Sequence, residues 1–64
     1  MRNHVEALRR ERKWSQEALG REVGVSRQTV NAIEAGRFNP SLPLALRLAR
    51  LFGKPVEEIL FDED

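Results

Sequence analysis

The sequence predicts an all-α fold in which five short helices pack into one compact domain. The chain has 64 residues, the length of one small domain, which is expected to span residues 1–64. Apolar residues recur at intervals of three and four along most of the chain, as they do on one face of a helix. Potential N-caps and glycines divide these repeats into helices at about residues 4–12, 16–23, 27–35, 42–52 and 55–60.

The first helix, residues 4–12, is expected to begin after Asn3, whose side chain can cap its free amides. Val5 and Leu8 mark the side of this helix that faces the core. Arg9 lies next to Leu8, at the edge of that side. The other basic residues near the end of the helix suit the negative end of its dipole, and most of them need no further role.

The stretch from Gln16 to Ala35 is typical of two helices joined by a tight turn. Ser15 and Ser26 are good N-caps, and they lie eleven residues apart. This spacing leaves about two turns for the first helix and three to four residues for the turn, which is a helix-turn-helix. Gly24 is placed to end the first helix in the left-handed conformation. Gly20 is a candidate for the contact between the two helices, although it could simply be tolerated.

The second helix of this unit has one apolar side and one polar side. Val30 and Ile33 are expected to face the core. The outward side chains are polar, with Thr29 to one side: Arg27, Gln28 and Asn31. Arginine can donate two hydrogen bonds to guanine, glutamine or asparagine can pair with adenine, and a threonine methyl can contact thymine. The second helix is therefore expected to read DNA bases, although Thr29 could equally contact a phosphate.

Three polar residues are candidates for phosphate contacts, which position a protein on DNA without reading its sequence. Gln16 opens the first helix of the unit, where backbone amides attract anions. The alternative is that Gln16 is an ordinary residue near a helix cap. Arg37 and Asn39 lie in the loop that follows the second helix, and for Arg37 the alternative is a solvated loop charge.

The last part of the chain predicts two more helices. Ser41 caps the helix at residues 42–52, and this helix is expected to turn five apolar residues toward the core: Leu42, Ala45, Leu48, Ala49 and Phe52. Further apolar residues do not fit that side and are candidates for a homodimer surface, although some could belong to the core: Leu44, Leu46, Leu51 and Phe61. Pro55 begins the helix at residues 55–60, and the acidic residues 62–64 are expected to fray.

Composition limits the class of function. Residues 1–37 carry a net charge of +3 and residues 38–64 a net charge of −2. Phosphate is an obvious partner for the basic part, although +3 also fits an ordinary mixed surface. The chain has no cysteine and one histidine, so neither disulfides nor a zinc site are expected, and His4 is expected to lie on the surface. The absence of cysteine is consistent with a reducing cytosol, and a cytoplasmic protein is expected.

Several other classes of protein are not expected. No apolar run approaches the roughly 20 residues of a membrane span, so no membrane partner is expected. The sequence shows no nucleophile paired with a base, no metal cluster and no glycine-rich phosphate loop. So short a chain also leaves little room for a ligand pocket of about 300–1,000 Å³. We therefore expect no enzyme activity, no cofactor and no small-molecule effector.

The two-helix unit resembles the phage-repressor and Cro (XRE) family of helix-turn-helix regulators. Gln16 opens its first helix, and small or apolar residues occupy the family's positions for such residues: Leu19, Gly20, Val23, Gly24, Val25, Val30 and Ile33. The stretch GRFNPSLPLALRLARLFGKPVEEIL looks like the last two helices of that family, so the resemblance covers about residues 5–60. This sequence departs from the family pattern at Gly20, where alanine is commoner, and at Pro43, early in the fourth helix.

This resemblance implies a repressor-like DNA-binding domain whose third helix lies in the major groove. It also implies an ion pair between Arg9 and Glu34. The expected function is sequence-specific binding of double-stranded DNA by a transcriptional regulator. The regulator is expected to be a repressor that acts as a homodimer on a two-fold symmetric operator. The alternative is a protein-interaction module of the same fold, such as an antitoxin-like subunit, but the polar outer side of residues 27–35 favours DNA.

Overall fold

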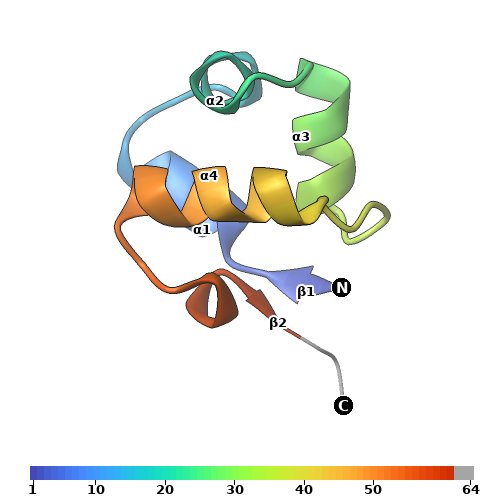
Figure 1. Ribbon diagram of the computed structural model, residues 1–64. Helices are drawn as coiled ribbons and strands as arrows, with labels where there is room; N and C mark the ends of the chain where they lie inside the picture. The colour runs from blue at the N-terminus through green and yellow to red at the C-terminus, as the bar shows by residue number, and fades with distance from the viewer. Residues whose placement is uncertain (62–64) are drawn as a thin grey trace.

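The computed structural model describes residues 1–61, where it contains four α-helices, one short 3-10 helix and a two-stranded sheet. The α-helices are α1 (Val5–Glu11), α2 (Gln16–Val23), α3 (Arg27–Glu34) and α4 (Leu42–Phe52). The 3-10 helix is Val56–Glu58, and the strands are β1 (Arg2–Asn3) and β2 (Leu60–Phe61). In Figure 1, α3 runs along one side of the molecule, α1 lies behind α4, and the strands lie below. The expected fraying of residues 62–64 lies outside the described residues.

The prediction of a fifth α-helix at residues 55–60 is wrong, and the fold is mostly helical rather than all-α. One 3-10 turn, Val56–Glu58, replaces this helix, and the chain then continues as β2. This strand pairs antiparallel with β1, with Arg2 opposite Phe61 and Asn3 opposite Leu60. A six-residue segment is too short to be a stable α-helix by itself. Here β1 supplies backbone partners that an isolated segment lacks.

Serine side chains begin three of the helices, as the sequence predicts. The hydroxyl oxygens of Ser15, Ser26 and Ser41 accept hydrogen bonds from backbone amides three residues later, at 3.0, 3.1 and 3.3 Å. At the start of α1 the Oδ1 atom of Asn3 accepts from the amide of Val5 at 3.0 Å. Each of these bonds satisfies an amide that the helix itself cannot pair, which typically contributes about 1 kcal/mol.

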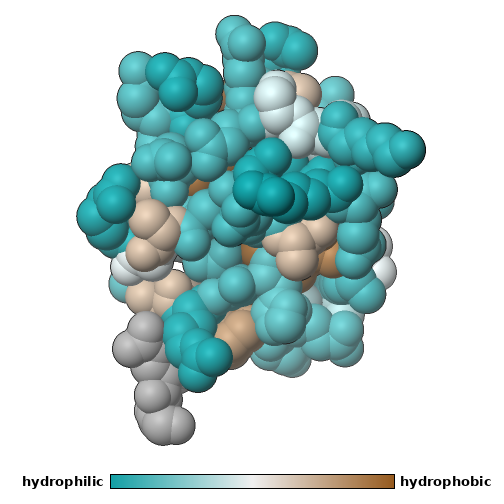
Figure 2. Space-filling view, turned by 180° about the vertical axis from the view of Figure 1, so that it is seen from behind, coloured by the Kyte–Doolittle hydropathy of each residue, from teal (hydrophilic) through white to brown (hydrophobic). Residues whose placement is uncertain are grey.

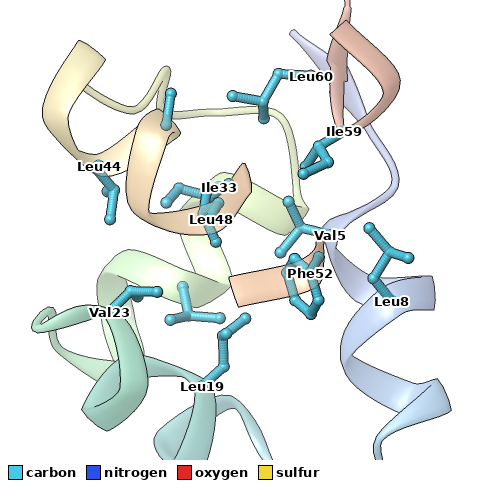
Figure 3. Packing of buried hydrophobic residues seen from close by; sticks show 12 residues of the cluster. Val5, Leu8, Leu19, Val23, Ile33, Leu44, Leu48, Phe52, Ile59 and Leu60 are labelled. Atoms are coloured by element: carbon cyan, nitrogen blue, oxygen red, sulfur yellow. The ribbon is translucent and has the colours of Figure 1, made fainter. Parts of the chain in front are cut away.

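All four helices and the segment after α4 contribute to one core, shown in Figure 3. The side chains with the least exposed surface come from each of these elements: Val5, Leu19, Val30, Leu48 and Ile59. The expected orientation of α4 is wrong at its first turn, because Leu42 is 70% exposed whereas Leu44 is 5% exposed. The buried side of α4 consists of Leu44, Ala45, Leu48 and Phe52. Leu42, the first residue of the helix, does not belong to it.

The turn between α2 and α3 is packed tightly against Gly20. A Cβ atom at this position would lie 2.5 Å from the carbonyl oxygen of Val25, a backbone atom. The Gly20 carbonyl accepts from the amide of Gly24 at 2.7 Å and from that of Val25 at 2.9 Å. Gly24 has a φ of +81°, so it ends α2 in the left-handed conformation. The absence of a side chain at Gly20 allows α2 to approach the turn this closely.

Replacement of Gly20 by alanine is expected to destabilise the protein. Overpacking lowers the free energy of unfolding by about 1–3 kcal/mol, whereas the better helix propensity of alanine raises it by about 0.5–1 kcal/mol. We therefore expect a net loss of about 1–2 kcal/mol in the free energy of unfolding, measured by urea denaturation. Ala18→Gly, on the same helix, is the control for the propensity term, although it also removes one half-buried methyl group. A Gly20→Ala variant as stable as the wild type would contradict the proposed close contact.

Candidate nucleic-acid interface

The outer side of α3 is polar and open to solvent. Arg27, Gln28 and Asn31 are exposed, whereas Val30 and Ile33, on the opposite side, are 2% and 3% exposed. Positions 27, 28 and 31 of one helix lie on the same side of it, so the structure brings these three candidate base-reading residues together. Within residues 1–61, Arg27 and Gln28 form no hydrogen bond or ion pair through their side chains. Their donors and acceptors are therefore available to another molecule.

Thr29 differs from these three residues because its polar group is used within the helix cap. Its side chain is half-buried. The hydroxyl of Ser26 donates to Thr29 Oγ1 at 3.1 Å and also accepts from the Thr29 amide at 3.1 Å. This pair holds the first turn of α3, where the candidates Arg27 and Gln28 lie.

Behind the polar side of α3 lies a buried ion pair that joins α1 to α3. Arg9 Nε donates to Glu34 Oε2 at 2.7 Å, and Arg9 Nη2 donates to Oε1 at 3.1 Å. The two side chains are only 10% and 5% exposed. Arg9 Nη1 also donates to the carbonyl oxygen of Trp14 at 2.8 Å. The hydrogen bond with Glu34 raises the pKa of Arg9 above its ordinary value, although burial opposes this shift.

Gln16 belongs to the same network. Its Nε2 atom donates to Glu34 Oε1 at 3.0 Å, so this carboxylate receives three hydrogen bonds. An ionised carboxylate only accepts, so the nitrogen end of the Gln16 amide must face Glu34. The other N–H of the Gln16 amide forms no hydrogen bond within residues 1–61, so Gln16 stays a candidate for a phosphate contact. The sequence did not reveal this contact, because it joins residues that are 18 positions apart.

The loop after α3 places Arg37 over the last turn of that helix. Gly36, with a φ of +77°, donates its amide to Ile33 O at 3.0 Å, and the amide of Arg37 donates to Ala32 O at 2.9 Å. These two bonds form a Schellman motif, which fixes where the chain leaves the helix. Arg37 Nη2 then donates to Asn31 Oδ1 at 3.2 Å. A candidate phosphate residue therefore contacts a candidate base-reading residue, while Asn39 lies exposed in the same loop.

Two further polar side chains hold the helix-turn-helix from outside it, through contacts that the sequence did not predict. Asn3 Nδ2 donates to the carbonyl oxygen of Ile33 at 2.8 Å, near the end of α3. Arg47 Nη1, from α4, donates to the carbonyl oxygen of Val23 at 3.2 Å, at the end of α2. The Arg47 bond gives a partner to a carbonyl at the end of α2. The Asn3 bond is the second one that Ile33 O accepts, since the amide of Gly36 also donates to it. Neither could be found from local spacing, because their partners are 30 and 24 residues away.

The described residues also bear on other kinds of site. The face seen in Figure 2 is mostly hydrophilic, with small apolar areas separated by polar side chains. Within residues 1–61 no group of three histidine, cysteine, aspartate or glutamate side chains is placed to hold a metal ion. None of the helices in the part that the structure describes is both long and apolar enough to cross a membrane.

Comparison with known proteins gives consistent matches. A family model described as Helix-turn-helix (HTH_3) matches residues 5–59. HTH-type transcriptional regulators from Methanocaldococcus jannaschii and from Bacillus subtilis (YgzD) are 44% and 47% identical over 64 residues, which cover 100% of this chain and 97% of each relative. Among solved structures, the P22 c2 repressor protein in complex with a synthetic operator is similar, with a TM-score of 0.80 and 28% identity. This similarity covers 84% of this chain and 82% of that chain.

Replacement of Arg9 by methionine is expected to lower the free energy of unfolding by about 3–5 kcal/mol, because the Glu34 carboxylate then lies buried without its cation. The double variant Arg9→Met/Glu34→Leu should recover most of this loss, since removing both partners is often close to neutral. Urea unfolding followed by far-UV circular dichroism measures both changes. A double variant no more stable than Arg9→Met would contradict an energetic link between the two side chains.

Proposed function

The chain belongs to this helix-turn-helix family of DNA-binding transcriptional regulators, and we propose that it is a sequence-specific repressor. In this proposal α3 lies in the major groove of an operator. The observation that carries the proposal is the exposed polar side of α3, which presents Arg27, Gln28 and Asn31 together. The buried pair of Arg9 and Glu34 supports this helix from behind. A helix presented in this way fits the width of the major groove of B-DNA.

The base contacts come mainly from the first turns of α3. Arg27, the first residue of the helix, suits guanine, because its guanidinium can donate to both O6 and N7. Gln28 follows directly and suits adenine, for which an amide supplies both a donor and an acceptor. Asn31 lies one turn later on the same side. The hydroxyl of Thr29 is bonded to Ser26. In this proposal Thr29 therefore contacts a base through its methyl group.

The phosphate contacts flank these base contacts. The free backbone amides at the start of α2 favour an anion, and Gln16 adds its remaining N–H there. On the other side of α3, Arg37 and Asn39 lie exposed in the loop. Such contacts fix the position of a protein on the duplex and make its affinity depend on salt.

We propose a homodimer on a two-fold symmetric operator, and burial changes which residues are the best candidates for its surface. Leu44 is buried in the core, whereas Leu51 and Phe61 are half-buried and offer less apolar surface than an exposed side chain. Leu46 remains, at 41% exposed. The other large apolar side chains that are exposed lie close to it in sequence: Phe38 at 45% and Leu42 at 70%. These three residues are the corrected candidates.

Selection of bound DNA from a random duplex pool tests this function. We expect enrichment of one sequence composed of two symmetric half-sites about 34–36 Å apart or a multiple of that distance. A titration on the enriched duplex should show affinity falling as salt rises, with a log–log slope of about −0.9 for each phosphate contact. A pool without enrichment would overturn the proposal and would favour a protein partner. A single unpaired half-site would overturn the homodimer alone.

Arg27→Ala is expected to lose about 1–3 kcal/mol of binding to the enriched duplex and to relax the preference at one base pair. The reason is that the O6 and N7 atoms of a guanine then lose the two hydrogen bonds that Arg27 donates to them. Fluorescence anisotropy on the enriched duplex and on a scrambled duplex of equal length measures the loss. Equal losses on the two duplexes would assign Arg27 to the phosphate backbone.

A further inference from the structure

We propose that Arg37 determines base specificity by orienting Asn31, in addition to any contact that it makes with phosphate. This inference rests on the proposed function, because it concerns how α3 distinguishes bases. Its structural basis is the hydrogen bond from Arg37 Nη2 to Asn31 Oδ1, 3.2 Å long. Arg37 is therefore a positioning residue that acts through the base-reading side chain.

The backbone holds Arg37 in place for this role. The Schellman motif at the end of α3 fixes the residue after Gly36, through the 2.9 Å bond from the Arg37 amide to Ala32 O. Asn31 lies in the regular part of the helix, where its Cα position is also fixed. The guanidinium thus returns along the outer side of the helix from a defined starting point and meets the amide of Asn31.

While this bond is formed, the chemistry of arginine allows only one orientation of the Asn31 amide. A guanidinium has five N–H donors and no acceptor, so the group that faces it must be an oxygen. Oδ1 is therefore turned toward Arg37, and the two N–H groups of Nδ2 point away from it. Oδ1 still has a second lone pair, so Asn31 keeps both a donor and an acceptor for a base.

This orientation matters because an amide can present its donor and acceptor in either order. Asparagine reads adenine by donating to N7 and accepting from N6, and a rotated amide reverses that order. In water the exposed contact between Arg37 and Asn31 stabilises the fold very little. When the groove excludes water, the lower local dielectric strengthens the same bond. Arg37 thus favours one order of donor and acceptor at the base pair that Asn31 reads.

The test compares Arg37→Met, Asn31→Ala and the double variant on four duplexes. These are the duplex enriched by the wild type and its three single-base alternatives at the position that Asn31→Ala relaxes. The wild type should discriminate there by about 5- to 150-fold, the range for one good base contact. Arg37→Met should lower the logarithm of this discrimination factor by at least about a third. The double variant should discriminate among the four duplexes as well as Asn31→Ala alone. The reason is that Arg37 acts on discrimination through Asn31, which is already absent.

Arg50→Met is the matched control, because it removes one exposed arginine that forms no side-chain bond within residues 1–61. It should leave the discrimination unchanged. If Arg37→Met weakens all four duplexes by one common factor, Arg37 is a phosphate contact alone and the proposal is overturned. The same holds if Asn31→Ala relaxes no position. An unenriched pool for the wild type would overturn the function and this inference together.

A measurement without DNA separates these failures. In the free protein, the side-chain amide resonances of Asn31 in a ¹H–¹⁵N NMR spectrum should shift in Arg37→Met and stay unchanged in Arg50→Met. Unchanged resonances in both variants would overturn the proposed orientation of Asn31, whatever the outcome for DNA binding. A shift in Arg37→Met together with an unenriched pool would leave the contact established and the DNA function refuted.

Discussion

The ion pair between Arg9 and Glu34 is the interaction on which the position of α3 depends. It joins α1 to the end of α3, and through Trp14 O and Gln16 it also holds the segment that leads into α2. A buried pair of this kind contributes little net stability compared with apolar residues of similar size. Its larger effect is geometric, because the bidentate contact admits few relative orientations of the two helices. The exposed polar side of α3 therefore keeps one direction relative to the rest of the fold.

The features of the fold that depend on neighbouring residues could be predicted from the sequence. Ser15, Ser26 and Ser41 cap their helices, and Gly24 ends α2, because these effects act within four residues along the chain. The last segment could not be predicted in this way. Its residues 55–60 carry helix signals, but the partner that makes β2 a strand is β1, at the other end of the chain.

The same distinction applies to the candidate site. The outward direction of Arg27, Gln28 and Asn31 follows from the periodicity of α3 and was predicted. The contacts of Gln16 with Glu34 and of Arg37 with Asn31 were not, because a pattern of residue types does not show which side chains meet in space. Both contacts change the chemical interpretation, since each fixes the orientation of an amide that the sequence leaves free.

The sheet of β1 and β2 has a consequence for motion. Its strands have two residues each and lie at the ends of the described residues, so few hydrogen bonds oppose their local opening. The sheet is therefore among the first parts to open in native-state fluctuations and among the last to form during folding. Asn3 belongs to β1 and also bonds to Ile33 O at 2.8 Å. Opening of the sheet thus weakens one of the bonds at the end of α3, so that fluctuations of β1 and β2 reach this helix.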